Sequence, residues 1–239
     1  MKTTNWIEAE RERIVAMYQC KDKEGPGKQP WQAAAFFKDA EKKLHAALML
    51  HKAGVFPKPD DPCLEVGFGT LGWLGDLITW GVEETNLHGI ELNANRVALA
   101  QKVLPVADLR VGDATELPWE SNTFALVIVS TVFSSILDER VRRIVAAEVT
   151  RVLKPGGALL WYDTAFSPRT PKLKRIGIKR WEIQQLFPQL SGRTRSVTLF
   201  PPLARFLVHF SWALATCLAA LPFLRTHLLA VLVKKSLGY

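Results

Sequence analysis

From residue 60 onward, apolar runs of strand length alternate with amphipathic stretches of helix length. The runs predict strands near 62–66, 86–91, 106–110, 124–129 and 157–163, and the stretches predict helices over 71–80, 93–103 and 137–153. Residues 124–129 and 158–161 are apolar at consecutive positions, as expected for strands that are covered on both faces. The pattern therefore predicts an α/β protein with a doubly wound, mostly parallel sheet.

Further elements flank this core on both sides. Helices are predicted over 5–20 and 31–53, separated by the glycines and proline of residues 21–28. After the core we expect a short helix from Arg180 to Phe187, a strand from Thr194 to Phe200 that is stopped by two prolines, and a final strand around His227 to Val233.

The first predicted strand runs into a glycine loop, Cys63-Leu-Glu-Val-Gly-Phe-Gly-Thr-Leu-Gly72. Glycine is needed where a strand turns sharply into a helix, because a Cβ would block both the backbone angles and the approach of a ligand to the exposed amides. Glu91 ends the next strand, where a carboxylate accepts hydrogen bonds from both hydroxyls of a ribose. The glycine spacing also fits a dinucleotide-binding loop, so a nicotinamide-dependent oxidoreductase remains an alternative.

Three further features favour a cofactor with an ammonium group, a ribose and an adenine over a dinucleotide. Glu65 precedes the first glycine, where it is unsuited to a pyrophosphate but suited to an ammonium group. Asp113, in Val111-Gly-Asp-Ala114, follows the third strand and is placed to accept from an adenine amine. A helix end and turn, Arg151-Val-Leu-Lys-Pro-Gly-Gly157, opens the fifth strand. Together these residues resemble the class I S-adenosylmethionine-dependent methyltransferases of the small-molecule type.

The resemblance extends from about Asp60 through the last strand and implies more than a cofactor. It implies a Rossmann-like sheet of seven strands whose last strand is antiparallel and lies between its neighbours. Leu71 departs from the pattern, because many members carry a glycine there. The segments Trp161-Tyr-Asp163, Phe133-Ser-Ser-Ile-Leu-Asp138 and Leu224-Arg-Thr-His227 are also similar to a bacterial branch found in gene clusters for polysaccharides or secondary products.

The resemblance assigns cofactor-binding roles to the loop and to the strand ends. The amides of Gly67 and Gly69 would approach the methionine carboxylate, at a helix N-terminus that favours an anion. Glu65 would face the ammonium group, Glu91 would bind the ribose hydroxyls, and Leu92 would pack on the adenine.

Four more residues complete the expected cofactor site. Asp113 and Ala114 would hold the edge of the adenine, and the carbonyl of Ser130, at the end of the fourth strand, would contact the ammonium group. Tyr18 would cover the cofactor from the N-terminal helices.

Tyr162 and Asp163 are the candidate catalytic residues, because they end the fifth strand and ligands of open α/β sheets bind beyond the carboxyl ends of the strands. Asp163 is our first candidate for a base or an anchor for the acceptor. Methyl transfer gains mostly from alignment and exclusion of water, so a base is needed only for some acceptors. His209 and His227 lie singly in apolar runs, and we expect both to be structural.

Composition and charge bear on partners and location. The net charge is +8 and is dispersed apart from a basic run over 169–180, which we expect to be a solvated loop and helix face. The alternative is that this run contacts an acidic acceptor or an anionic lipid surface, and no nucleic acid is expected as partner. The three cysteines have neither metal-ligand nor disulfide spacing, and no bound metal is expected. The N-terminal residues lack the apolar core of a signal peptide, which favours a cytoplasmic protein.

The apolar segment from Leu203 to Leu221 approaches the length of a membrane span. We do not expect a span, because the flanking strands should belong to one sheet. We expect one apolar helix that is buried against the sheet, the acceptor pocket or a second subunit, which leaves a homodimer open. The alternative is peripheral contact with the inner face of the membrane, favoured by Phe210, Trp212 and Arg205.

The sequence thus predicts a single domain over 1–239, with an N-terminal helical cap (1–57), a cofactor-binding core (58–200) and an apolar helix followed by the final strand (201–239). The expected function is transfer of a methyl group from S-adenosylmethionine to the oxygen, nitrogen or carbon of a small molecule in a biosynthetic pathway. An acidic or lipid-linked glycan or a secondary-metabolite intermediate is the favoured acceptor. The alternatives are an NAD(P)-dependent oxidoreductase and a non-catalytic, cofactor-binding partner of another methyltransferase.

Overall fold

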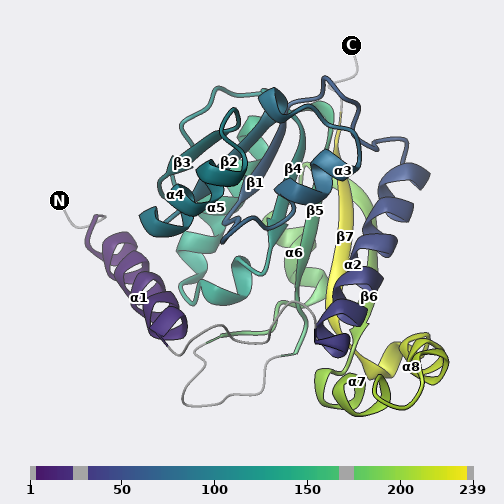
Figure 1. Ribbon diagram of the computed structural model, residues 1–239. Coiled ribbons are helices and arrows are strands. Elements are labelled where there is room, and N and C mark those ends of the chain that lie inside the picture. The colour runs from purple at the N-terminus through teal and green to yellow at the C-terminus, as the bar shows by residue number, and fades with distance from the viewer. Residues whose placement is uncertain (1–3, 24–31, 167–174, 236–239) are drawn as a thin grey trace.

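A computed structural model of the protein describes residues 4–23, 32–166 and 175–235 (Figure 1). Strands and helices alternate through the centre of the chain, and helices flank this core at both ends. The α-helices are α1 (Thr4–Lys23), α2 (Ala33–Lys52), α3 (Leu74–Thr79), α4 (Ala94–Val103), α5 (Glu139–Val152), α6 (Arg180–Leu186), α7 (Pro201–Leu207) and α8 (Trp212–Ala219). The strands are β1 (Cys63–Val66), β2 (Leu87–Glu91), β3 (Asp108–Val111), β4 (Phe124–Ser130), β5 (Leu153–Thr164), β6 (Leu190–Leu199) and β7 (Arg225–Lys234). Short 3₁₀ turns are η1 (Glu84–Asn86), η2 (Phe133–Ser135) and η3 (Pro222–Leu224).

The seven strands form one sheet in the order β3-β2-β1-β4-β5-β7-β6. Strands β1 to β5 pair in parallel, whereas β7 is antiparallel to both of its neighbours, β5 and β6. This confirms the predicted sheet, including the insertion of the last strand between its neighbours. The order reverses between β1 and β4, and such a switch point is where open α/β sheets bind ligands.

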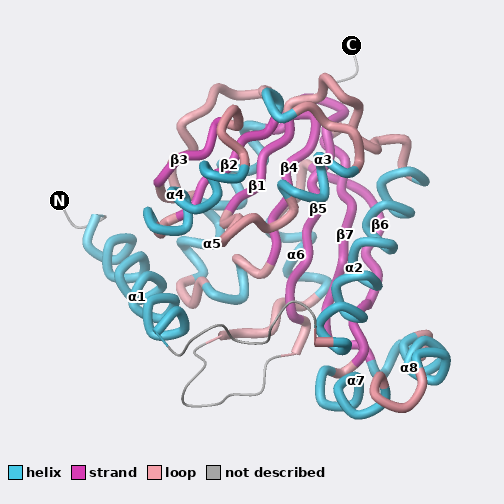
Figure 2. Tube along the Cα trace, in the orientation of Figure 1, coloured by secondary structure: helices cyan, strands magenta, loops and turns pink. Residues whose placement is uncertain are grey.

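Helices cover both faces of the sheet (Figure 2). On one face, side chains such as Val145 of α5 and Ile183 of α6 pack with Leu159 and Trp161 of β5. On the other face, α2, α3 and α4 pack with the alternate β5 positions Ala158, Leu160 and Tyr162. Neighbouring side chains of β5 therefore belong to different layers, as the pleat of a strand requires.

The two N-terminal helices, α1 and α2, lie in different places in the structure. Helix α2 belongs to the layer that covers the sheet, where Ala46 and Leu50 are fully buried. Helix α1 lies on the opposite side of the molecule in Figure 1 and packs against η2 and the start of α5. There Glu10 accepts from the amide of Leu137, and Arg13 donates to the carbonyl of Ser135.

The apolar segment between β6 and β7 is two short helices rather than the single helix expected from the sequence. Helix α7 ends at Leu207, and Ser211 begins α8 as its N-cap, with its hydroxyl accepting from the amide of Leu214 at 3.2 Å. Small and aliphatic side chains of both helices pack around Phe37 and Leu199. Among the described residues, no helix is both long and apolar enough to cross a membrane.

The expected burial of the aromatic residues in this segment is wrong. Phe210 is 75% exposed because it lies in the turn between the two helices, and Trp212 is 44% exposed at the start of α8, which buries Ala215 and Ala219 instead. Part of the basic run expected over 169–180 lies in residues 167–174, which are outside the described residues.

Gly192 tests the pairing of β6 with β7. A Cβ on Gly192 would lie 2.0 Å from the carbonyl oxygen of Val231 on the neighbouring strand, so a larger residue must push the two backbones apart. Gly192→Ala should lower the free energy of unfolding by about 1–3 kcal/mol, measured by urea denaturation. Ser191→Ala, at the exposed neighbouring position, is the control, and equal stability of the two variants would contradict the packing described here.

Candidate cofactor and acceptor site

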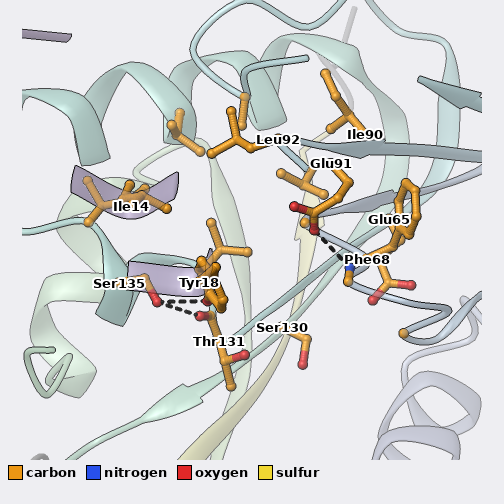
Figure 3. A pocket seen from close by; sticks show the side chains of 18 of the residues that line it. Ile14, Tyr18, Glu65, Phe68, Ile90, Glu91, Leu92, Ser130, Thr131 and Ser135 are labelled. Atoms are coloured by element: carbon orange, nitrogen blue, oxygen red, sulfur yellow. Dashed lines mark hydrogen bonds between the residues drawn. The ribbon is translucent and has the colours of Figure 1, made fainter. Parts of the chain in front are cut away.

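A cavity of about 620 Å³ opens at the carboxyl ends of β1, β2, β4 and β5, beside the switch point (Figure 3). Helix α1 contributes Ile14 and Tyr18 to its wall, and the first turns of α2 and the start of β7 also reach it. A volume of this size is typical of small-molecule sites. The topology accounts for its position, because parallel strands bring their carboxyl ends to one edge of the sheet and β7, being antiparallel, begins at that edge.

The glycine loop between β1 and α3 forms one side of the cavity. Gly67, Gly69 and Gly72 have φ angles of +71°, +64° and +49°, which side chains with a Cβ rarely adopt. No heavy atom lies within 4 Å of the position that a Cβ of Gly69 would take, so the backbone is open to the cavity there. The positive φ of Gly72 also delays the helix, which begins at Leu74 rather than at the expected residue 71.

Glu65 lies buried beneath this loop. Its carboxylate accepts from the amides of Trp73 at 2.6 Å and Leu74 at 3.2 Å, at the start of α3. A Cβ on Gly72 would lie only 2.2 Å from a carboxylate oxygen of Glu65, so this pairing requires glycine at position 72. Burial raises the pKa of Glu65 to about 8, although the two amides and the charge of Lys42 oppose the rise.

Glu91, at the end of β2, connects the loop to the next strand. One carboxylate oxygen accepts from the amide of Gly69 at 2.9 Å and the other accepts from the amide of Asn93 at 3.1 Å. Each carboxylate oxygen can accept a further hydrogen bond, so Glu91 is oriented by the backbone and still able to bind hydroxyl groups. Leu92 follows on the cavity wall.

The remaining residues expected to bind a cofactor also line this cavity. Asp113 and Ala114 lie beyond β3, where the Asp113 carboxylate accepts from the amide of Thr115 at 2.8 Å. Ser130 ends β4. Tyr18 projects from α1, and its hydroxyl lies 3.1 Å from the hydroxyl of Ser135 (Figure 3). The structure thus brings together all nine positions from five separate segments of the chain.

Tyr162 lines the cavity, but Asp163 does not, which corrects the expectation that both face it. The two are neighbours on β5 and their side chains point to opposite faces of the sheet. The Asp163 carboxylate is fully buried and accepts from the amides of Ser134 at 2.9 Å and Thr164 at 2.8 Å. Burial raises its pKa to about 6. Its position suits a structural anchor for the turn after β4.

The cavity also contains residues that the sequence analysis did not assign to it. Lys42 of α2 lies 4.6 Å above the Trp73 ring, and Arg175 donates to the Tyr18 hydroxyl at 3.2 Å. His227 stacks on Tyr162 with ring centroids 5.0 Å apart, although we expected it to be structural. The antiparallel direction of the last strand could have revealed His227, because that direction places the start of β7 at the ligand-binding edge.

Comparisons with known proteins agree with this geometry. Residues 63–157 match the family described as "Methyltransferase domain". A demethylmenaquinone methyltransferase of Bacillus mycoides (strain KBAB4) is 30% identical over 113 residues, which cover 45% of this chain and 46% of that protein. The corresponding protein of Bacillus cereus (strain ATCC 10987 / NRS 248) is 33% identical over the same shares. The chain thus spans about half the length of the relatives it matches.

Solved structures extend the agreement to the whole fold. Geranyl diphosphate C-methyltransferase from Streptomyces coelicolor A3(2), solved with Mg²⁺, geranyl diphosphate and S-adenosyl-L-homocysteine, superimposes with a TM-score of 0.61 at 12% identity, over 89% of this chain and 86% of that chain. Phosphoethanolamine N-methyltransferase 2 of Haemonchus contortus gives a TM-score of 0.57 at 18% identity, over 80% of this chain and 52% of that one. At these identities the likeness shows a shared fold, and together with the match of residues 63–157 it agrees with the resemblance to class I methyltransferases seen in the sequence.

The raised pKa of Glu65 makes stability depend on pH. Because the pKa is about 8 in the folded protein and near 4.5 otherwise, Glu65 contributes stability that is fully present below pH 4.5 and is lost as pH rises through 8. The loss amounts to about 3–5 kcal/mol. Glu65→Gln should flatten the fall of the wild-type unfolding free energy between pH 5 and 8. If the unfolding free energies of the two proteins, measured by chemical denaturation, fall in parallel over this pH range, the raised pKa of Glu65 is contradicted.

Proposed function

We propose that this protein transfers a methyl group from S-adenosylmethionine to a small-molecule acceptor, and that the described residues work as one functional unit within a single domain over 1–239. The observation that carries the proposal is the convergence of the open glycine loop and two oriented carboxylates, Glu65 and Glu91, on one cavity. The loop offers amides to a carboxylate, Glu65 is an acid that can face an ammonium group, and Glu91 is an acid that can bind ribose hydroxyls. These three features match, in order, the carboxylate, the ammonium group and the ribose of the cofactor.

The chain's own residues would hold the cofactor as follows. The amides of Gly67 and Gly69, which we expected at its carboxylate, donate instead to the carbonyl of Ile90 and to Glu91, so the amides that follow them would face the carboxylate. Glu65 and the carbonyl of Ser130 would face its ammonium group, and Glu91 would accept from its ribose hydroxyls. Leu92, Asp113 and Ala114 border the adenine, and Tyr18 covers it from α1. When bound, the cofactor supplies an electrophilic methyl group on a sulfonium, whose charge is lost as the methyl leaves.

The residues after β4 and β5 would face the acceptor. Tyr162 is nearly buried, and its hydroxyl bonds to that of Thr198 at 2.9 Å, so its ring is held rigidly on the cavity wall. Burial raises its pKa, which keeps the phenol protonated and able to position an acceptor. Asp163 acts in this proposal by fixing the turn of Ser134, not by proton transfer.

Two alternatives make different predictions for binding. A nicotinamide-dependent oxidoreductase would bind NAD in the same cavity, and a non-catalytic partner would bind the cofactor without consuming it. Calorimetric titration with S-adenosylhomocysteine and with NAD distinguishes the first alternative, and turnover of S-adenosylmethionine distinguishes the second. We expect S-adenosylhomocysteine to bind and NAD to bind weakly or not at all.

Glu91→Ala tests the ribose role. The substitution removes two charge-assisted hydrogen bonds, each worth about 1.5–3 kcal/mol, so S-adenosylhomocysteine affinity should fall by at least 100-fold. Glu120→Ala, an exposed acid that is not among the cavity residues, should bind like the wild type. Calorimetry showing unchanged affinity in a folded Glu91→Ala protein would refute the assignment.

We further propose that α7, α8 and η3 contact an anionic membrane surface, from which the protein takes a lipid-linked or amphiphilic acceptor. Three phenylalanines support this proposal, because Phe206, Phe210 and Phe223 are 63%, 75% and 78% exposed. Phe206 and Phe210 lie against each other, with ring centroids 5.0 Å apart. Such a cluster of exposed aromatic side chains is unusual on a protein surface that water alone contacts.

Charge and position favour a lipid partner over another protein. No Asp or Glu follows Glu182 in the sequence, whereas Arg193, Arg195 and Arg205 lie in this part of the chain. In Figure 1, α7 and α8 extend from the lower edge of the sheet, where β6 ends and β7 begins. That edge is also the one on which the cavity opens, so contact with a bilayer would bring the cavity close to lipid.

The triple variant Phe206→Ser, Phe210→Ser, Phe223→Ser tests the membrane contact. Because these side chains are exposed, the fold should persist, while each loss removes on the order of 1.5 kcal/mol of apolar burial in lipid. Co-sedimentation with phosphatidylglycerol vesicles should therefore fall by more than about 100-fold. Trp181→Ser, which removes an equally exposed aromatic residue from α6, should leave it unchanged.

Salt and lipid composition complete the test. Binding of the wild type should weaken in high salt and on neutral phosphatidylcholine vesicles, because arginines contribute to it. Wild-type protein that stays in the supernatant with anionic vesicles at low salt would contradict the proposal. If, instead, the phenylalanines mediate a concentration-dependent dimer in analytical ultracentrifugation, a second subunit covers this surface.

A further inference from the structure

His227 faces the cavity in a setting that determines which of its ring nitrogens carries the proton. It occupies the third position of β7, opposite Thr164 of β5 and Val197 of β6. Its ring is parallel to that of Tyr162 within 5°. Stacking on a rigid, buried tyrosine fixes the plane of the imidazole. The neighbouring Thr226 bears on its tautomer, that is, on which ring nitrogen carries the hydrogen.

Thr226 assigns the tautomer. Its hydroxyl has one proton, which it donates to the carbonyl of Thr198 at 3.3 Å. The same oxygen lies 2.9 Å from Nδ1 of His227 and so acts there as an acceptor. With the hydroxyl proton on the Thr198 carbonyl, the contact to Thr226 requires a hydrogen on Nδ1 and leaves the lone pair on Nε2. Among the described residues, Nε2 has no hydrogen-bond partner.

The carbonyl that orients Thr226 belongs to an unusual backbone. Thr198 has a φ of +68° and interrupts the pairing of β6 with β7, since Val197 pairs with His227 and Leu199 pairs with Arg225. Glu41 of α2 holds this strained residue by accepting from the amides of Thr198 at 3.2 Å and Leu199 at 3.3 Å. A β-branched residue in this region is rare, and such strain concentrates at functional sites.

Positive charges surround the imidazole. Burial, followed by the charges of Lys38, Arg175 and Lys42, lowers the pKa of His227 to about 4, so the ring is neutral at pH 7. Lys42 is paired with Asp39 at 2.8 Å. Arg175 differs, because its Nε is buried and has no hydrogen-bond partner in the described part of the chain. A cationic donor that is left unsatisfied in a cavity wall is suited to an anionic ligand.

We propose that Nε2 of His227 is the general base of the reaction and that the acceptor is a phenol or enol that also carries a carboxylate or phosphate, which binds to Arg175. This proposal rests on the proposed methyltransferase function. As the acceptor oxygen bonds to the methyl carbon, the carbon–sulfur bond breaks with its electron pair remaining on sulfur, and the hydroxyl proton passes to Nε2. The proton then leaves to solvent.

The class of acceptor follows from the same surroundings. A base that is neutral among three cations takes a proton efficiently only from an acidic hydroxyl, which favours phenols and enols over alcohols. The imidazolium formed would be repelled by Lys38, Lys42 and Arg175 unless an anion of the acceptor offsets their charge. Tyr162 is protonated, and Glu41 already accepts from the amides of Thr198 and Leu199, so neither competes for the proton.

Nitrogen NMR of histidine-labelled protein, saturated with S-adenosylhomocysteine, reads the tautomer directly. At pH 7 His227 should show the Nδ1–H tautomer, whereas free histidine prefers Nε2–H. Thr226→Val should shift His227 towards Nε2–H, and Thr226→Ser should restore the wild-type spectrum. An Nε2–H or doubly protonated His227 in the wild type would overturn the assignment of the base.

Three probes test the acceptor class in the same complex: 4-hydroxybenzoate, phenol and benzoate. We expect 4-hydroxybenzoate to bind at least tenfold more tightly than either of the others and to shift the Nε2 resonance. His227→Gln should remove its advantage over benzoate, and Arg175→Gln should remove its advantage over phenol. Equal binding of the three probes, or no binding, would overturn the acceptor class.

His209→Gln, which changes an exposed histidine outside the cavity, is the matched control and should behave as the wild type in every measurement. The affinity for S-adenosylhomocysteine distinguishes a failure of the proposed base from a failure of the proposed methyltransferase function. If His227→Gln retains that affinity and the wild type fails the tautomer test, only the present inference is wrong. If the wild type does not bind S-adenosylhomocysteine, the proposed function itself is wrong.

Discussion

The buried carboxylate of Glu65 is the interaction on which the rest of the site depends. By accepting from the amides of Trp73 and Leu74, it ties the end of β1 to the start of α3 and fixes the curvature of the loop between them. That curvature requires glycine at position 72, where any Cβ would collide with the carboxylate. It also directs the amide of Gly69 to Glu91, so one buried acid indirectly orients the second.

A second, strained region lies around Tyr162 on the other side of the cavity. Thr131, with φ of +59°, donates its amide to the Tyr162 carbonyl at 2.7 Å, and Thr198, with φ of +68°, bonds to the Tyr162 hydroxyl. Each such conformation costs on the order of 1–3 kcal/mol, which the surrounding sheet must offset. The result is a tyrosine held at both ends and an imidazole stacked on it. In the proposed function, the glycine loop binds the cofactor and this region faces the acceptor.

Helices outside the sheet determine how these two regions meet the surface of the protein. Helix α1 packs on η2 through Glu10 and Arg13, so Tyr18 and Ile14 close the cavity from one side. Helices α7 and α8 bury small side chains and expose phenylalanines at the edge on which the cavity opens. The same edge thus combines a binding cavity, an apolar surface and an excess of positive charge, a combination suited to acceptors with an apolar body and an acidic group.

Local pattern in the sequence was sufficient for much of this protein. The order of strands and helices and the gathering of the nine expected residues at one cavity could be predicted, because glycine loops and strand ends have local requirements, whereas the antiparallel last strand was implied by the family resemblance. Tertiary structure decided the rest. Residues 158–161 are apolar at every position, so the sequence carries no alternation to show that Tyr162 faces the cavity and Asp163 the opposite layer. The apolar run 203–221 likewise does not show which of its side chains are buried and which are exposed. His227 acquires its chemistry only from Thr226, Thr198 and Glu41, because the sheet brings together residues that lie far apart in the chain.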